Sequence, residues 1–293
     1  MPTVPQVSRL CLKNILFPTD LSSDSRAALP FARALAEIYG STLQFAYCIP
    51  PEPLRQVVPD VLPAQDNLVW QNARARIRKF AEQSSLATTP YKTIVDRGEL
   101  ADVIPAIISE HEVDMVVLAT HGRRGISKMV FGSAAEQIYR SAPCPVLTVG
   151  PKACDSKEWK PRRILCPIDM SEDPEPALHY ALSLAEENQA EFILVQSIPL
   201  VPWQHRESME KQARAALAGL IPEQAKDWCV PQVVIRWEHP VEAILRESQE
   251  REPDLIVMSV HKARAVPWSS HLPWPVASEV VGRASCPVLT IRV

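Results

Sequence analysis

The sequence lacks the long apolar runs that mark a membrane span. No stretch reaches the roughly 18 consecutive apolar residues that a spanning helix needs, and the first twenty residues contain no continuous apolar segment typical of a secretory leader. The formal net charge is only -3, which gives no electrostatic reason to expect a nucleic-acid partner. We therefore expect a cytoplasmic protein that binds neither a membrane nor nucleic acid.

Cysteine pairs, metal-ligand spacings and common catalytic motifs are also missing. The seven cysteines are widely scattered, with no C-x-x-C pair and no neighbouring histidines, so we expect reduced thiols and no metal site. H-E-x-x-H, G-x-S-x-G and Walker A motifs are absent as well. The sequence therefore gives no residues for a recognised enzyme class, and we do not expect an enzyme.

What the sequence does contain is an internal repeat. Residues 15–36 (ILFPTDLSSDSRAALPFARALA) match residues 164–185 (ILCPIDMSEDPEPALHYALSLA) at eleven of 22 positions, with an offset of 149 residues. Later matches have offsets of 140 (VDMVVL and PDLIVM) and 142 (CPVLTV and CPVLTI). Two copies of one domain explain this self-similarity. We predict domains at residues 1–152 and 160–293, separated by a short polar segment.

Each copy alternates short apolar runs with helical patterns. In the first copy, the expected strands are 14–18, 42–49, 91–96, 115–120 and 146–149, and the expected helices are 25–39, 68–83, 100–110 and 133–141. Strands such as MVVLA and LIVMS are apolar on both faces, which favours a parallel sheet covered by helices on each side. The predicted fold is α/β, with two tandem open, doubly wound, five-stranded parallel sheets. Such sheets bind ligands beyond the strand carboxyl ends, where the strand order reverses.

The segment from Ala119 to Ser133 (ATHGRRGISKMVFGS) has the composition of a phosphate-binding loop. It leaves an expected strand, and its Gly-Ser end opens an expected helix. Its glycines let backbone N–H groups turn toward an anion, and the helix N-terminus adds positive potential. The alternative is that the glycines only shape a turn and Ser133 only caps the helix.

Charged side chains accompany this loop. Arg123 and its basic neighbours supply cationic groups for a phosphate, or they are simply solvated. Asp20 closes the first strand in the same crevice, where its carboxylate either accepts hydrogen bonds from a ribose hydroxyl or an adenine amine, or caps a helix. His121 and His261 recur at one position, and we interpret them as polar turn residues, with a catalytic base as the alternative.

Together these residues resemble the universal stress protein family. The pattern ILFPTDLSSDS, then ATHG, nine residues, GS and PCPVLTV carries the resemblance, which covers both copies. The family signature for nucleotide binding is Gly-x-x-Gly, nine residues, Gly-Ser/Thr; here alanine replaces the first glycine. The resemblance implies Rossmann-like sheets that pair antiparallel through their last strands, 145–149 and 287–291, as an intrachain pseudo-dimer.

The resemblance also implies an adenine nucleotide, ATP or AMP, with or without Mg²⁺, in the first copy. Cys48 falls where a small residue of the second strand touches adenine, and it is otherwise a buried small hydrophobe. The nucleotide-binding residues implied in this way are Pro18, Asp20, Cys48, Leu118, Ala119, His121, Gly122, Arg123, Gly132, Ser133 and Ala134.

The second copy departs from the signature at every glycine. Ser259-Val-His-Lys262 replaces Ala119-Thr-His-Gly122, and an alignment of Glu136 with Glu279 places Pro275-Val276 against Gly132-Ser133. Proline has no N–H and valine has no hydroxyl, so a phosphate would lose donors. We expect one nucleotide per chain, in the first copy.

The loop of the second copy carries Trp268 and Trp274 instead. We expect their rings to fold over the vacated cleft, with a partner-binding surface as the alternative.

Three functions are compatible with the sequence. The first is a nucleotide-dependent regulatory protein of the stress response that acts on a protein partner we cannot name. The second is a slow ATPase that uses Ser133, His121 and the basic loop residues. The third is a ligand-free scaffold, favoured if Ala119 has abolished the site. Dimerisation of whole chains is left open.

Overall fold

The chain folds into two similar α/β halves. The computed structural model describes residues 10–23, 25–51, 63–86, 88–120, 133–153, 159–170, 173–198, 203–260 and 273–293. The first repeat contains β1 (Asn14–Pro18), η1 (Ser25–Ala28), α1 (Leu29–Tyr39), β2 (Thr42–Ile49), α2 (Pro63–Glu82), β3 (Tyr91–Arg97), α3 (Leu100–Glu110), β4 (Met115–Ala119), α4 (Ser133–Ser141) and β5 (Val146–Val149). The second contains β6 (Arg163–Pro167), α5 (Glu175–Asn188), β7 (Glu191–Ser197), α6 (Trp203–Leu220), η3 (Glu223–Asp227), β8 (Gln232–Arg236), α7 (Pro240–Arg251), β9 (Leu255–Val260), α8 (Pro273–Arg283) and β10 (Val288–Arg292).

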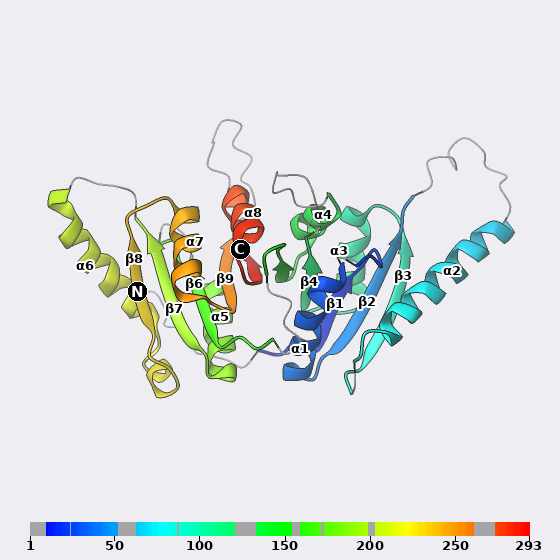
Figure 1. Cartoon of the computed structure of the whole chain (residues 1–293), viewed down its shortest axis with the longest axis horizontal. Coiled ribbons are helices and arrows are strands. Elements are labelled where there is room, and N and C mark those ends of the chain that lie inside the picture. The colour runs from blue at the N-terminus through cyan, green and yellow to red at the C-terminus, as the bar shows by residue number, and fades with distance from the viewer. Residues whose placement is uncertain are drawn as a thin grey trace.

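The strands form one continuous sheet. Its order is β3-β2-β1-β4-β5-β10-β9-β6-β7-β8. Neighbours within each repeat run parallel, whereas β5 and β10 pair antiparallel at the centre, with Leu289 opposite Leu147. We call this β5–β10 pairing the seam. Figure 1 shows the two halves side by side about the seam, with α2 and α6 at opposite ends of the molecule. The predicted fold class, including the edge-to-edge meeting of the two last strands, is confirmed.

Helices cover both faces of the sheet and bury two apolar cores. One core packs α1, α2, α5 and α6 against side chains such as Ile15 and Ile164, and the other packs α3, α4, α7 and α8 against Leu16 and Leu165. Adjacent residues of β1 and β6 thus face opposite layers, as a strand buried on both faces requires. Each core contains residues of both repeats, so the halves share their interior.

Some element boundaries differ from the sequence prediction. The predicted helix 25–39 opens with a 3-10 turn, and β3 runs one residue further than expected, to Arg97. Helix α2 starts at Pro63, five residues before the predicted start at Leu68, because PAQDN has no apolar periodicity although proline suits a first helical turn. Among the described helices, none combines the length and apolar character needed to cross a membrane.

An equivalent aspartate fastens the start of the first strand in each repeat. Asp114 Oδ2 accepts hydrogen bonds from the N–H groups of Lys13 and Asn14 at 2.7 and 2.8 Å. Asp254 Oδ2 accepts from the N–H groups of Arg162 and Arg163 at 3.0 and 2.9 Å. The two repeats thus share not only their fold but also this pair of side-chain hydrogen bonds.

The segments that precede β1 and β6 cross to the opposite repeat. The N–H of Leu10 donates to Glu187 of α5 at 3.0 Å. The ring of Trp159 packs edge-on against Phe31 of α1, with centroids 5.3 Å apart, and its indole N–H donates to the Asp254 carbonyl at 3.1 Å. Trp159 is only 7% exposed, so it joins the repeats through both apolar burial and a hydrogen bond.

Replacing Trp159 should therefore destabilise the whole chain. We expect Trp159→Ala to lower the free energy of unfolding by about 3–5 kcal/mol, because it empties a buried site between the repeats. Trp159→Phe keeps an aromatic ring and loses the indole donor, so it should cost less, on the order of 1–2 kcal/mol. Urea unfolding followed by circular dichroism measures both variants. An alanine variant as stable as the wild type would contradict the assigned role.

Candidate functional site

A cavity opens at the switch point of the first repeat. Strand β1 pairs with β2 along its full length but pairs with β4 only at Ile15 and Leu16, so β1 and β4 diverge toward their carboxyl ends. Open α/β sheets hold ligands at such a reversal of strand order. The cavity there measures about 290 Å³, near the lower limit for small-molecule sites.

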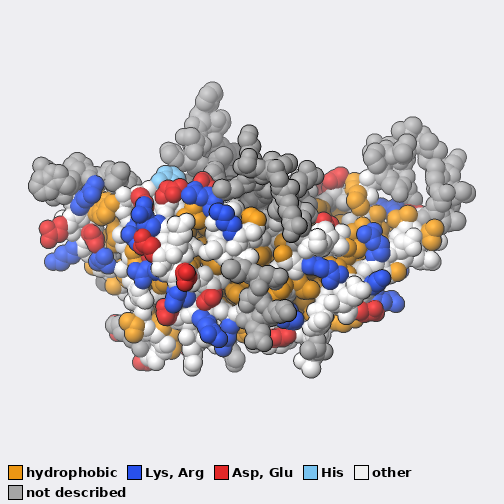
Figure 2. Space-filling view, viewed as in Figure 1, with side chains coloured by type: hydrophobic (Ala, Val, Ile, Leu, Met, Phe, Trp, Pro, Cys, Tyr) orange, Lys and Arg blue, Asp and Glu red, His pale blue; other side chains and the backbone are white. Residues whose placement is uncertain are grey.

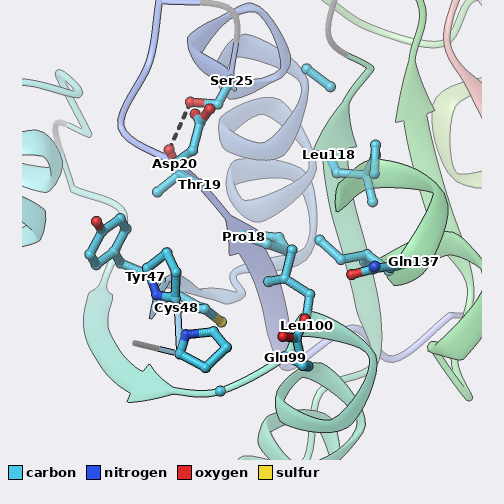
Figure 3. A pocket seen from close by; sticks show the side chains of 17 residues that line it. Pro18, Thr19, Asp20, Ser25, Tyr47, Cys48, Glu99, Leu100, Leu118 and Gln137 are labelled. Carbon is cyan, nitrogen blue, oxygen red and sulfur yellow. Dashed lines mark hydrogen bonds between the residues drawn. The ribbon is translucent and has the colours of Figure 1, made fainter. Parts of the chain in front are cut away.

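The cavity walls come from strand ends, the start of α3 and the side of α4. The lining residues are Pro18, Thr19, Asp20 and Ser25 after β1; Ala46, Tyr47, Cys48, Pro50 and Pro51 from β2 and its exit; Gly98, Glu99 and Leu100 at α3; Leu118 and Ala119 of β4; and Ala135, Gln137 and Ile138 of α4. Figure 3 shows Pro18 between Cys48 on one side and Leu118 and Gln137 on the other. The interior is mainly apolar, and Asp20, Glu99 and Gln137 add polar groups.

Hydrogen bonds hold the turn after β1 in shape. The hydroxyls of Thr19 and Ser25 lie 2.7 Å apart, and the N–H of Leu21 donates to Thr19 Oγ1 at 2.9 Å. Leu21 has a φ of 65°, a left-handed conformation that costs a non-glycine residue about 1–2 kcal/mol. Asp20 Oδ1 accepts from the N–H of Ser22 at 3.0 Å. Asp20 therefore caps this turn, not a helix, and lies exposed beside the cavity.

Glycine is required where β3 turns into α3. Gly98 has a φ of +148°, and a Cβ at this position would lie 2.9 Å from a methyl group of Val103. A larger residue would push the first turn of α3 away from the strand end. Gly98 thus keeps the start of α3 against the cavity.

Cys48 lies in the cavity wall as a neutral thiol. Burial raises its pKa to about 11, and the negative charge of Asp96, its register partner on β3, adds to the shift. Since the thiolate is the reactive form, the site disfavours cysteine chemistry at neutral pH. This environment agrees with the interpretation of Cys48 as a small packing residue.

The structure brings together the predicted site residues that it describes. Pro18, Asp20, Cys48, Leu118 and Ala119 all line the one cavity. The predicted contacts His121, Gly122, Arg123 and Gly132 lie outside the described residues, as do His261 and Trp268. Ser133 and Ala134 are the first two residues of α4, and the structure describes their backbone only.

Sequence reasoning missed two walls of the cavity. Gly98, Glu99 and Leu100 follow the third strand, so the rule about strand carboxyl ends could have found them. Gln137 and Ile138 lie in α4, and no sequence pattern distinguishes them from ordinary helix residues.

The equivalent place in the second repeat is organised differently. Ser197 stands where the first repeat has Cys48, and Glu238 stands where it has Gly98. The Ser197 hydroxyl donates to the Glu238 carbonyl, while the Glu238 carboxylate pairs with Arg246 at 3.0 Å. A side-chain hydrogen bond thus connects β7 to the turn after β8. The corresponding residues of the first repeat, Cys48 and Gly98, line the cavity.

The structure corrects one part of the repeat alignment. In α4 and α8 the buried positions coincide at an offset of 142 residues, which places Ala135, Ile138 and Ala142 opposite Ala277, Val280 and Ala284. Pro275 therefore stands opposite Ser133, and Trp274 opposite Gly132, in place of the Pro275-Val276 pairing expected from the glutamates. The error arose because the identity of two glutamates that are not buried was given more weight than the period of the buried face.

The fold and the cavity define a class of protein. This class has two doubly wound α/β repeats that share one sheet through their last strands, with a cavity at the switch point of the first repeat. A family model described as the universal stress protein family matches residues 12–150 and again residues 160–292. The chain therefore belongs to the universal stress protein family, and this membership supports a role in the stress response.

Individual relatives agree with this assignment. A universal stress protein of Methanocaldococcus jannaschii is 26% identical over 145 residues, which cover 47% of this chain and 81% of the relative. A universal stress protein of Thermus aquaticus is 26% identical over 140 residues, covering 47% of this chain and 98% of the relative. The crystal structure of a universal stress protein from Archaeoglobus fulgidus matches with a TM-score of 0.72 and 17% identity, covering 95% of this chain and 98% of that chain. This likeness extends the shared fold to both repeats.

The raised pKa of Cys48 predicts slow alkylation. We expect the labelling rate of Cys48 by iodoacetamide to rise about tenfold per pH unit between pH 8 and pH 10, because each unit below the pKa of about 11 lowers the thiolate fraction tenfold. Peptide mass spectrometry follows the label at Cys48 and, as an exposed reference thiol, at Cys11. Rapid, pH-independent labelling of Cys48 at pH 8 would contradict the buried environment.

Proposed function

We propose that this chain is a nucleotide-dependent regulatory protein of the stress response that binds one ATP or AMP in its first repeat. The observation that carries the proposal is the cavity at the β1–β4 switch point. Its described walls contain Pro18, Asp20, Cys48, Leu118 and Ala119, the residues for which the family resemblance implies contact with adenosine. The same cavity borders α4, the helix that the Gly-Ser of the phosphate-binding segment opens.

The chemistry of the walls suits a nucleoside. Ala46, Leu118 and Ile138 offer apolar surface for a planar base, and burial of such surface contributes about 25 cal/mol per Å². Asp20 lies at the exposed side, where a carboxylate accepts hydrogen bonds from ribose hydroxyls or from an exocyclic amine. These walls would hold the adenosine part of the ligand.

The phosphates would extend toward the N-terminus of α4. This helix starts at Ser133, and its residues Ala135, Gln137 and Ile138 line the cavity, so its first turn lies at the cavity edge. Backbone N–H groups and the helix dipole favour an anion there. Gly132 and Ser133 would supply donors, and Mg²⁺ would accompany a triphosphate through its oxygens.

We assign binding rather than turnover to this site. Among the described lining residues the ionisable groups are Asp20, Glu99, Cys48 and Tyr47, and Cys48 is held as a neutral thiol. This set pairs no nucleophile with a base that could activate it. The bound nucleotide would instead change the affinity of the chain for a protein partner.

The second repeat would not bind a nucleotide. Pro275 offers neither the hydroxyl nor the N–H that Ser133 supplies, and Lys262 replaces a glycine of the signature. Each lost charge-assisted bond costs about 1.5–3 kcal/mol. The Ser197–Glu238 hydrogen bond further occupies the corresponding wall.

Isothermal titration tests the number of sites and their place. We expect ATP and AMP each to bind wild-type chain at one site. Gly132→Asp should abolish binding, because it adds a side chain and a negative charge where the phosphates approach. Asp20→Ala should raise the Kd roughly tenfold through loss of a charge-assisted hydrogen bond.

The two repeats provide a matched control for this titration. Asp169 occupies in the second repeat the place that Asp20 occupies in the first, so Asp169→Ala should leave the Kd unchanged. Two sites per chain, or binding that survives Gly132→Asp, would contradict the assignment of the nucleotide site to the first repeat. Phosphate release that is proportional to protein and lost in Gly132→Asp would favour the slow ATPase. No nucleotide in acid extracts and no heat of binding would favour the scaffold.

A further inference from the structure

The C-terminal end of α4 is held by side chains of the second repeat. Arg292, at the end of β10, donates from Nη1 to the carbonyl of Ala142, immediately after α4, at 3.0 Å. The Thr290 hydroxyl donates to the Val146 carbonyl at 3.1 Å. Tyr139 of α4 lies beside both side chains; burial raises the pKa of Tyr139, and the neighbouring Thr290 and Arg292 oppose that rise. A cation at a helix C-terminus also complements the helix dipole.

Among the described residues, no side chain of the first repeat makes an equivalent hydrogen bond to the end of α8. At the offset of 142 residues, Gly150 takes the place of Arg292 and Thr148 takes the place of Thr290. A Cβ on Gly150 would lie only 2.2 Å from the Val281 carbonyl of α8, so no side chain fits there. Among the described residues, the buried Thr148 hydroxyl finds no hydrogen-bond partner. Among the described residues, a side-chain hydrogen bond across the seam therefore supports the end of α4, whereas Gly150 approaches the end of α8 with its backbone.

Helix α4 connects this support to the cavity. Its residues Ala135, Gln137 and Ile138 line the cavity, and its first residue is Ser133 of the phosphate-binding segment. The next residue along the helix, Tyr139, faces the seam beside Thr290. A helix of nine residues thus contacts the cavity along one part and the second repeat at its C-terminal end.

We propose that the second repeat acts as the support of the ligand site in the first, with Arg292 as the residue that positions α4 for the phosphates of a bound nucleotide. This rests on the proposed function, because it concerns the same cavity. The second repeat does not need a nucleotide of its own for this task. By thermodynamic reciprocity, a bound phosphate that orders α4 must also strengthen the contact between α4 and Arg292.

Titrations with ATP and with adenosine separate positioning from general stability. In Arg292→Ala we expect the Kd for ATP to rise about fivefold, because the phosphates depend on the first turn of α4. The Kd for adenosine should change less than about twofold, since strand ends supply most of the walls around it. Arg292→Lys keeps the charge and should recover most of the ATP affinity.

Arg283→Ala is the matched control, since it removes an arginine of the second repeat whose ion pairs are with Glu242 and Glu279 of the same repeat. It should leave both Kd values unchanged. Hydrogen exchange provides an independent readout, in which saturating ATP should slow the amides at the end of β10 in the wild type and not in Arg292→Ala.

The outcomes distinguish this inference from the proposed function. A wild-type chain that binds no nucleotide overturns both. A wild-type chain that binds ATP, with Arg292→Ala binding it equally well, overturns only the support role. Equal losses of ATP and adenosine affinity together with a lower free energy of unfolding would show a merely structural arginine, and would overturn the positioning role as well.

Discussion

The antiparallel pairing of β5 with β10 is the constraint on which the rest of the structure depends. Each repeat ends in an apolar strand, and such a strand is an aggregation hazard if its edge stays open. The pairing of these two strands joins two five-stranded sheets into one sheet. Each of the two apolar cores therefore contains residues of both repeats. The crossed segments that contain Leu10 and Trp159 then pack each repeat against the other. The two similar halves therefore share both apolar cores.

The seam also determines what surrounds the candidate ligand site. Helix α4 lines the cavity, and its C-terminal end is held by Arg292, so α4 connects β10 directly to the cavity. Figure 2 shows charged side chains spread over the visible face of the molecule between apolar and uncharged ones. The cavity, in contrast, is mostly apolar, with Asp20 and Glu99 as its carboxylates among the described residues. The lining of the cavity thus differs in chemistry from the visible face of the molecule.

Much of this architecture could be predicted from the sequence because the signals were physical and repeated. The strands are apolar on both faces, which predicted a covered parallel sheet, and the resemblance to the universal stress protein family implied that the two last strands pair. The rule that ligands lie beyond strand carboxyl ends correctly placed Asp20 and Ala119 at one edge of the sheet. Sequence periodicity failed at α2, whose first turn is polar and extends beyond the apolar face.

Contacts that depend on three-dimensional register could not be predicted in the same way. The α4–α8 alignment needed the burial of Ala277 and Val280, since glutamates outside the core are not constrained to stay in register. Likewise Gln137, the hydrogen bond between Ser197 and Glu238, and the approach of Arg292 to Ala142 depend on how elements distant in sequence meet. No local pattern encodes such meetings.

The unequal pair of Arg292 and Gly150 has a consequence for the evolution of this chain. At a two-fold interface between identical subunits, each substitution appears on both sides, so a bulky arginine at this position would also meet the carbonyl that Gly150 approaches. Joining two copies in one chain removes this restriction, because each copy mutates separately. Covalent linkage also makes the association independent of protein concentration. A fused chain can therefore carry an arginine on one side of the seam and a glycine on the other, which a symmetric homodimer cannot.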